Sequence, residues 1–261
     1  MNESTVQSGE VVVGGVSVRW SGTSDIGKDR PENQDAFFVE AEVGLFLVSD
    51  GMGGHRGGAL AANIVAEDLP VMIETSLARL RSSSIRSVRG LLKRCIIEQN
   101  RHLRMEGGSE TGYKEMGTTV AVALLKDGRV YLGNLGDSRI YRFRKGRLRQ
   151  LSKDHSVVGE LVSKGKLSAE EAQEHALAHE ITHYVGMEEK AVPHVCSFTL
   201  AKGDRLVLCT DGLTSMVGDR EIAEIVRHHD ECEIACKSLI DAANAAGGHD
   251  NITVTVIDLG A

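Results

Sequence analysis

Hydrophobic and polar residues follow two different periods along the chain, and each period predicts one kind of element. Short apolar runs rich in Val, Ile and Leu predict strands, whereas apolar residues spaced three and four apart predict helices. Because both patterns recur from end to end, we expect a single α+β fold. The strands predicted in this way cover residues 11–20 (as one strand or two short ones), 36–39, 45–48, 118–125, 130–135, 139–143, 195–200, 205–209 and 252–257.

Helical periodicity is clearest over residues 59–73 and 85–105, and it returns over 219–228 and 231–246. Pro70 predicts an end or a kink near the close of the first of these helices. Residues 154–184 are also charged and helical in pattern, with a capped start near Ser168. Polar residues 1–10 predict a flexible N-terminus, and 11–261 are expected to form one domain.

Four aspartates lie where predicted strands end or begin. Asp50 follows a buried strand in LFLVSDGMGGHRGGA, Asp137 and Asp211 follow two others, and Asp250 precedes the last strand. Antiparallel strands bring such ends and starts to one edge of a sheet, so these acids can converge. Each Asp taken alone is explained by a simple turn, and only the repetition favours a site. Converging carboxylates need a cation, and oxygen ligands favour Mg²⁺ or Mn²⁺ over Zn²⁺.

Composition narrows the choice of function. The 261 residues carry a formal net charge of −7, which argues against a nucleic-acid partner. We find no apolar run of membrane-spanning length and no N-terminal targeting pattern. The five cysteines are odd in number and form no C-x-x-C pair, which favours free thiols in a reducing compartment. We therefore expect a cytoplasmic protein with no membrane and no nucleic-acid partner.

Two motifs point to other chemistry. Cys95 and Arg101 have the C-x5-R spacing of thiolate phosphatases, but no glycine loop precedes a helix there, so we set this motif aside. His179, Glu180 and His183 form H-E-x-x-H, which on a helix would bind Zn²⁺ with Glu180 as general base. Residues with weak helix preference surround this second motif. A zinc peptidase nevertheless stays open as an alternative.

The predicted helix 85–105 is strongly basic on one side. A solvated helix face is the simplest interpretation, and a partner surface is the alternative. Its basic residues are Arg86, Arg89, Lys93, Arg94, Arg101 and Arg104.

Seven segments in order resemble the type 2C family of metal-dependent protein serine/threonine phosphatases, in its bacterial single-domain form. They are SDIGKDRPENQDAF, DGMGGHRGG, MGTTV, GNLGDSRIY, LSKDHSVVGELVSKGKLSAEEA, LVLCTDGLTSMV and DNITV. One such segment is a weak signal, but seven in sequence are specific. The resemblance implies an α/β/β/α sandwich of two antiparallel sheets flanked by helices, with a helical flap at about 154–190 and a phosphatase domain over 11–261.

Carried over position by position, the resemblance implies a binuclear metal centre. Asp50 would bridge the two ions, and the carbonyl of Gly51 would bind the second. Asp211 and Asp250 would complete the first, and Asp35 would hold a water of the second. Two Mn²⁺ or Mg²⁺ ions are the implied cofactors.

Further roles follow from the same resemblance. Asp137, together with Asp211, would hold a third and weaker ion, and Arg30 would bind the substrate phosphate. His55 is a candidate proton donor for the leaving group. Met52 stands where eukaryotic members carry a candidate His, so a metal-bound water is the alternative donor.

The H-E-x-x-H motif falls within the segment that resembles the family's flap. Ala176 occupies the position of a Pro in the family's flap, and Ala178 occupies that of an Arg. His179 occupies the position of an Asn, and His183 occupies that of a second Arg. The motif is then a diverged form of the flap sequence. The absence of two cationic side chains implies altered recognition of phosphopeptides.

The function implied is hydrolysis of phosphoserine and phosphothreonine in proteins by a metal-activated water. Such an enzyme would act in signalling by dephosphorylation, with phosphorylated proteins as substrates and a serine/threonine kinase as the activity it opposes. A non-catalytic phosphoprotein-binding module is the remaining alternative. It is disfavoured because every expected metal ligand is present.

Overall fold

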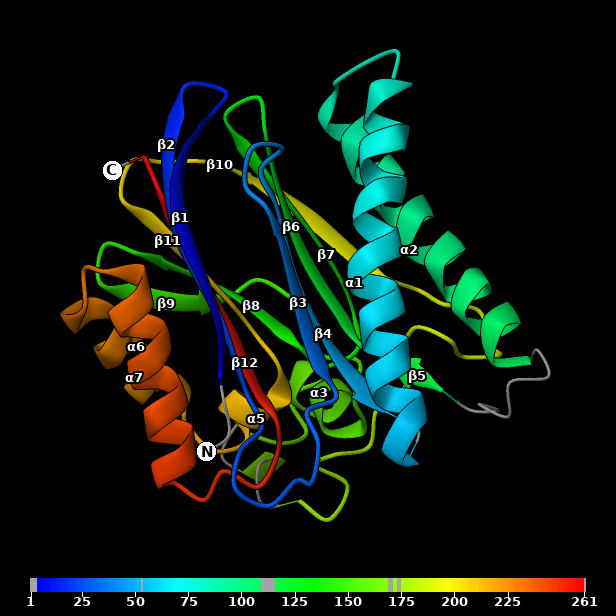
Figure 1. The fold of residues 1–261 in the computed structure, drawn as a ribbon, viewed down its shortest axis with the longest axis vertical. Coiled ribbons are helices and arrows are strands. Elements are labelled where there is room, and N and C mark those ends of the chain that lie inside the picture. The colour runs from blue at the N-terminus through cyan, green and yellow to red at the C-terminus, as the bar shows by residue number, and fades with distance from the viewer. Residues whose placement is uncertain (1–3, 53, 109–115, 169–170, 173–174, 261) are drawn as a thin grey trace.

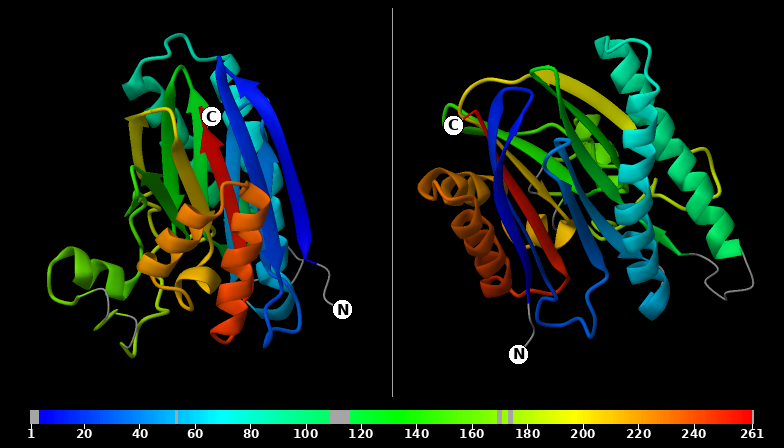
Figure 2. Two further views of the ribbon diagram at one scale, coloured as in Figure 1. Left: turned by 90° about the vertical axis from the view of Figure 1, so that its left-hand side faces the viewer. Right: turned by 45° about the horizontal axis from the view of Figure 1, so that its top comes forward.

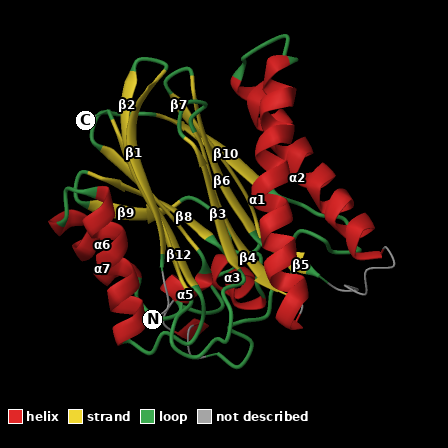
Figure 3. Cartoon of the chain, in the orientation of Figure 1, coloured by secondary structure: helices red, strands yellow, loops and turns green. Residues whose placement is uncertain are grey.

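The structure is a computed structural model that describes residues 4–52, 54–108, 116–168, 171–172 and 175–260, with the backbone alone at 54–56 and 108. Two antiparallel sheets pack face to face, and helices cover both outer faces (Figures 1 and 3). This confirms the predicted α/β/β/α sandwich.

The first sheet has the strand order β1-β2-β12-β11-β8-β9, and all its pairs are antiparallel. It joins the two ends of the chain, because the last strand β12 lies between β2 and β11. Its strands are β1 (Thr5–Val13), β2 (Val16–Asp25), β12 (Ile252–Leu259), β11 (Asp204–Cys209), β8 (Arg139–Arg144) and β9 (Arg147–Gln150).

The second sheet has the order β10-β7-β6-β4-β3, and the short β5 pairs with the end of β4. Its pairs are antiparallel as well. The strands are β10 (His194–Thr199), β7 (Arg129–Leu135), β6 (Val120–Lys126), β4 (Leu45–Met52), β3 (Asp35–Glu40) and β5 (Gly117–Thr118).

Two long helices, α1 (Gly54–Ala78) and α2 (Ile85–Gly108), cover the second sheet. On the opposite side α6 (Asp219–His228) and α7 (Cys232–Ala245) cover the first sheet, as the views in Figure 2 show. The shorter helices α3 (Val157–Ser163) and α5 (Asp211–Thr214) lie at one end of the sandwich (Figure 1). That end carries the predicted site.

The apolar run of β4 illustrates why these strands read as continuous hydrophobic stretches. Leu45 and Leu47 point into the core beneath α1 and α2, whereas Phe46 and Val48 point into the core between the sheets. A strand buried on both faces has no polar side to alternate with. Each fully buried side chain of this kind contributes about 1.5–3 kcal/mol. A third core lies between the first sheet and the pair α6–α7.

The structure corrects several predicted boundaries at the N-terminal half. Residues 5–10, expected to be flexible, belong to β1, and Thr5 pairs with Ser24. The segment 11–20 is divided between two strands by a turn at Gly14-Gly15, both with positive φ. Pro70 lies inside α1 and does not end it. The division at Gly14-Gly15 agrees with the two-strand alternative, whereas residues 5–10 were missed because β1 is mostly exposed and carries little apolar signal.

The segment 154–184 differs most from the prediction. Within its described residues, α3 and residues 171–172 are helical, whereas residues 175–179 form turns and a bend. The capped start at Ser168 does form, because the Ser168 hydroxyl accepts a bond from the Glu171 N–H at 3.1 Å and the Glu171 carboxylate accepts one from the Ser168 N–H at 2.7 Å. The charged pattern therefore predicted helix at residues 175–179, where the chain instead forms turns. Strand β9 was not predicted, because its arginines at alternate positions leave too few apolar residues for a strand pattern.

Candidate active site

A cleft of about 710 Å³ opens at the end of the sandwich where β4 and β11 finish and β12 begins. Five predicted site residues line it, namely Arg30, Asp50, Gly51, Asp211 and Asp250. The other lining residues include Gln34, Met52, His179, Ile181, Tyr184, Met216, His249 and Asn251. Segments far apart in the sequence therefore meet here, as the strand-end pattern predicted.

Asp50 lies in β4, which continues to Met52 instead of breaking at Ser49 as predicted. The Asp50 N–H donates to the Thr119 hydroxyl at 3.0 Å, and its carbonyl accepts from the Thr118 hydroxyl at 2.7 Å and the Thr119 N–H at 2.8 Å. These bonds fix the backbone that carries the carboxylate. The predicted MGTTV segment therefore has a positioning role.

Gly51 is required by close packing of the backbone. A Cβ at this position would lie 2.1 Å from the Gly58 carbonyl oxygen, and a Cβ on Gly58 would lie 2.8 Å from Gly51. The start of α1 thus packs directly on the end of β4. His55 belongs to this first turn of α1, and its side chain lies outside the described part of the structure.

Asp35 stands directly opposite Asp50 in the β3–β4 pair. Its carboxylate accepts a bond from the Thr210 hydroxyl at 2.8 Å, and that hydroxyl accepts from the Thr253 N–H at 3.0 Å. Burial raises the pKa of Asp35 to about 7, and the neighbouring acids Asp211 and Asp250 add to the rise. Thr210 was not identified from the sequence.

The remaining acids belong to the same electrostatic group. Burial raises the pKa of Asp50 well above its usual value, and Asp35, Asp211, Asp137 and Asp250 raise it further. Burial followed by the charge of Asp250 raises the pKa of Asp211. The neighbouring carboxylates therefore disfavour ionisation of Asp50 and Asp211.

Asp137 does not line the cleft but couples to it. It is 8% exposed, and burial and then the Asp211 charge raise the pKa of its carboxyl. Its Oδ1 is buried without a hydrogen-bond partner among the described residues. A buried carboxylate oxygen with no donor is a site where a cation is favoured.

Arg30 donates from Nη2 to the Asp250 carboxylate at 2.7 Å. The loop that carries Arg30 is held by Asn251, which is buried. The Asn251 amide donates to the carbonyls of Ile26 at 2.9 Å and Glu32 at 3.0 Å, and its oxygen accepts from the Gln34 N–H at 2.8 Å. Asn251 follows Asp250 in DNITV, but only the contacts reveal its role.

These oxygens suit a hard divalent cation. No group of three or more His, Cys, Asp or Glu side chains in the described chain has the spacing of a closed metal cluster. An ion held by one or two carboxylates and several waters does not need such a cluster, and Mg²⁺ binds in this way. The unpartnered Asp137 oxygen and the mutually repelling acids therefore fit ions that keep part of their water.

The H-E-x-x-H segment is not a helix. His179 lies in a turn and lines the cleft, whereas Ile181 forms an isolated bridge with Ser156. His183 instead approaches His155, with ring centroids 5.4 Å apart. The two motif histidines do not share a helix face, so the zinc-peptidase alternative is wrong in its geometry.

His155 forms hydrogen bonds that hold the H-E-x-x-H segment in place. Its carbonyl accepts bonds from the N–H groups of Thr182 at 2.7 Å and His183 at 3.4 Å, and its Nδ1 accepts from Gly136 at 3.2 Å. Burial lowers the pKa of His155 to about 4, and the neighbouring His183 lowers it further. The imidazole is therefore neutral at physiological pH.

Cys95 lies in the middle of α2, and burial raises the pKa of its thiol. It therefore lacks the activated thiolate that the C-x5-R motif requires. All five cysteines are free, which confirms the absence of disulfides. No helix in the described chain is long and apolar enough to cross a membrane.

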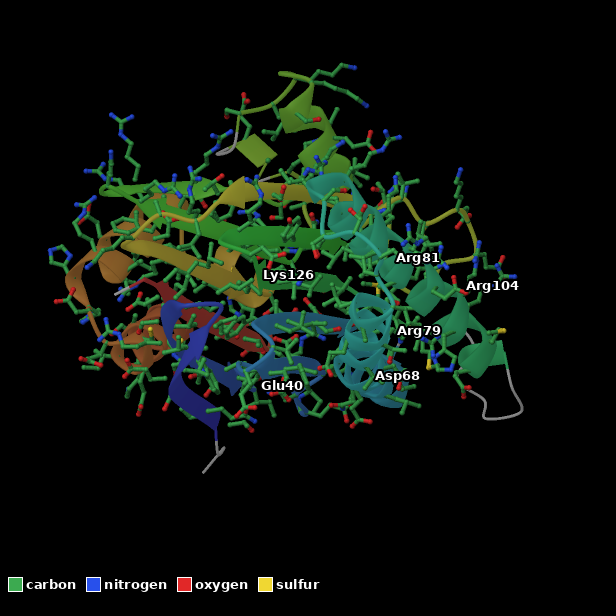
Figure 4. All side chains as sticks on the ribbon, turned by 90° about the horizontal axis from the view of Figure 1, so that it is seen from above. Glu40, Asp68, Arg79, Arg81, Arg104 and Lys126 are labelled. Carbon is green, nitrogen blue, oxygen red and sulfur yellow. The ribbon has the colours of Figure 1, made fainter. Side chains whose placement is uncertain are left out.

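The basic residues of α2 point away from its buried side, as a solvated face requires. All six are exposed, whereas Val88, Leu92 and Ile96 on the other side are buried. Figure 4 shows Arg104 on the outer side of this layer.

Comparison with known proteins gives a consistent result. The sequence model of protein phosphatase 2C matches residues 21–242. The protein phosphatase PhpP of Streptococcus pneumoniae is 34% identical over 240 residues, which are 90% of this chain and 95% of that protein. The serine/threonine phosphatase of S. agalactiae has a TM-score of 0.79 and 32% identity, over 97% of this chain and 99% of that one.

A solved structure of the catalytic domain of the phosphatase PstP, in complex with 2 manganese ions, is also similar. Its TM-score is 0.74 at 29% identity, over 94% of this chain and 100% of that one. The family match includes Asp50 and Asp211 of the cleft, and both solved structures share the fold over more than nine-tenths of this chain. The chain therefore belongs to the protein phosphatase 2C family of protein serine/threonine phosphatases.

Proposed function

We propose that the cleft hydrolyses phosphoserine and phosphothreonine in proteins, with two divalent ions, Mn²⁺ or Mg²⁺, as cofactors and a third, weaker ion beside Asp137. The observation that carries this proposal is the convergence of acids at one end of the sandwich. Asp50, Asp211 and Asp250 line one cleft, and Asp35 stands directly opposite Asp50 in the β3–β4 pair. When bound, the ions would offset the carboxylate charge and supply an acidic water for attack on phosphorus.

The chain's own residues divide the work. The pKa of Asp50 responds to all four of the other acids, so we propose that Asp50 would bridge the two ions, with the Gly51 carbonyl beside it. Asp211 and Asp250 would hold the first ion, and Asp35 would hold a water of the second. The Thr119 hydroxyl fixes the Asp50 backbone, and the Thr210 hydroxyl holds one oxygen of the Asp35 carboxylate.

Arg30 orients the phosphate. Its contact with Asp250 uses one of five guanidinium N–H groups, and its side chain is 49% exposed at the cleft. The remaining donors suit the equatorial oxygens of a phosphoryl group. Asp250 thus holds Arg30 at the cleft while Asn251 holds its loop. His55 stays the predicted proton donor, with water as the alternative.

We further propose that the predicted domain of residues 11–261, extended at its N-terminal end to include all of β1, is one phosphatase domain that opposes a serine/threonine kinase. The support is the family membership and the sandwich fold. Five free thiols support a reducing compartment such as the cytoplasm.

The test is hydrolysis of p-nitrophenyl phosphate by metal-stripped protein given Mn²⁺, Mg²⁺ or Zn²⁺ in parallel. We expect Mn²⁺ or Mg²⁺ to restore activity, and we expect Asp50→Ala and Asp211→Ala to lose it. Asp241→Ala, an exposed acid of α7, serves as the matched control and should retain full rate. Full activity in Asp50→Ala, or activity only with Zn²⁺, would contradict the assignment.

A further inference from the structure

The hairpin β8–β9 carries two pairs of like charges on one face. Arg142 stands directly opposite Arg149, and Arg144 directly opposite Arg147. The other face of the hairpin is apolar, since Tyr141, Phe143 and Leu148 pack toward α6 and α7. Like charges directly opposite each other in a sheet are destabilising. Two such pairs in succession therefore lower the stability of the folded hairpin.

Three of the four arginines have no ion-pair partner among the described residues, and the fourth, Arg144, pairs with the buried Asp204. The Nε of Arg142 is buried without a hydrogen-bond partner among the same residues. Arg147 and Arg149 are exposed. The formal net charge of the chain is −7, so this concentration of positive charge does not follow from composition.

The surface around the hairpin is preorganised. The guanidinium of Arg142 lies 5.0 Å from the centre of the Phe198 ring, and that of Arg144 lies 5.8 Å from it. Phe198 belongs to β10, the edge strand of the second sheet, while β9 is an edge strand of the first. Two sheet edges thus meet at these arginines. Their side chains are held on an aromatic ring before any partner arrives.

The spacing of the pairs suits an extended polypeptide. The two pairs are two residues apart along the strands, which corresponds to about 6.8 Å. Alternate side chains of an extended segment have the same repeat. Arginine binds carboxylates and phosphates in a bidentate manner, so Asp, Glu or phosphorylated residues at alternate positions match this face.

We propose that the face formed by Arg142, Arg144, Arg147 and Arg149 binds an acidic, extended segment of the phosphoprotein substrate. This proposal rests on the proposed phosphatase function. Arg142 is five residues along the chain from Asp137, or about 16 Å of strand, so the segment would lie roughly five or six residues from the phosphorylated residue.

The structure offers substitutions that separate docking from folding. Arg147→Glu and Arg149→Glu each place an acid opposite a retained arginine, which turns a repulsive cross-strand pair into an attractive one. We expect the double variant to unfold at the same or a higher temperature than the wild type. If this variant no longer binds the acidic segment, misfolding cannot be the cause.

The first measurement is fluorescence anisotropy with a labelled peptide that has Glu at alternate positions and no phosphate. We expect the double variant to bind it at least about 10-fold more weakly, because two charge-assisted contacts are lost. The matched control is Arg86→Glu with Lys93→Glu, the same charge change on the exposed face of α2. Equal loss in the control, or equal binding in both, would overturn the proposal, as would binding of phosphatidylglycerol vesicles in preference to the peptide.

The second measurement compares two phosphothreonine peptides, one with such a Glu stretch about six residues away and one without. The double variant should raise KM for the first about 10-fold and leave the second and p-nitrophenyl phosphate unchanged. Equal KM values for both peptides in the wild type would also overturn docking. Peptide binding without any hydrolysis would instead contradict the proposed function and leave the docking face standing.

Discussion

Asp35 and Asp50 are directly opposite each other in the β3–β4 pair, although two carboxylates in this position repel. Burial raises the pKa of both groups. The fold brings them together by backbone pairing and by threonine bonds that do not neutralise the charge. The site is therefore arranged at the expense of stability, and a cation is the natural compensation.

Replacement of Asp50 by Asn should stabilise the metal-free protein. Because the folded pKa of Asp50 lies above its unfolded value, the unfolded chain releases its proton first, and stability is lost as pH rises through the folded pKa. At pH 7.5 we expect Asp50→Asn to raise the melting temperature by at least about 2 °C.

The same variant should lose the response to metal. In the wild type, an ion at 100 times its dissociation constant adds about 2.7 kcal/mol of stability. We expect Mn²⁺ to raise the melting temperature of the wild type and of Asp241→Ala but not of Asp50→Asn. A lower melting temperature of metal-free Asp50→Asn would show that the carboxylate stabilises the fold.

Removal of the Asn251 side chain should affect both stability and the cleft. It is buried and makes three hydrogen bonds to the loop that carries Arg30. Asn251→Ala leaves these groups unpaired, at a cost of about 1–3 kcal/mol in urea unfolding. We also expect a higher KM for p-nitrophenyl phosphate. Asn63→Ala, which removes one exposed contact, is the control, and a KM equal to wild type in Asn251→Ala would separate this loop from phosphate binding.

Arg30→Ala tests phosphate binding directly. Loss of a guanidinium that binds the phosphoryl oxygens should reduce kcat/KM about 10–100-fold, mainly through KM. Arg30→Lys keeps the charge but not the fork of donors and should recover part of this loss. Steady-state kinetics with Mn²⁺ measures both. Unchanged constants in Arg30→Ala would remove this residue from the site.

Stability should fall in mild acid because of His155. The unfolded histidine titrates near pH 6.5 and the folded one at about 4. Between these values the unfolded chain binds a proton that the folded chain does not, so the free energy of unfolding falls as pH falls, by up to about 3 kcal/mol. Urea unfolding at pH 7.5, 6 and 5 measures this change.

His155→Gln retains a side chain able to accept the Gly136 N–H without titrating. We expect its stability to depend less on pH over the same window. An identical pH dependence in the two proteins would assign the effect to other groups.

The sequence by itself determined the fold class and most of its elements. A short, continuous apolar run identifies a strand that is buried on both faces. Helix α6 was predicted at its observed limits of Asp219 and His228. The sequence also selected the acids of the cleft, because Asp at successive strand ends and starts is a local pattern. The family resemblance added their order and the phosphate-binding role predicted for Arg30.

Only the tertiary structure decided the rest, because the deciding contacts join residues far apart in the chain. Asn251 holds the loop of Arg30 across more than 200 positions, and Thr210 reaches Asp35 in the same way. His179 and His183 match a zinc motif in sequence, yet the backbone is fixed by β-bridges to Ser156 and Thr118 and is not a helix. Arg142 and Arg149 are ordinary charged residues until strand register places them opposite each other. Periodicity records burial along one element, whereas register and long-range hydrogen bonds exist only once the elements pack.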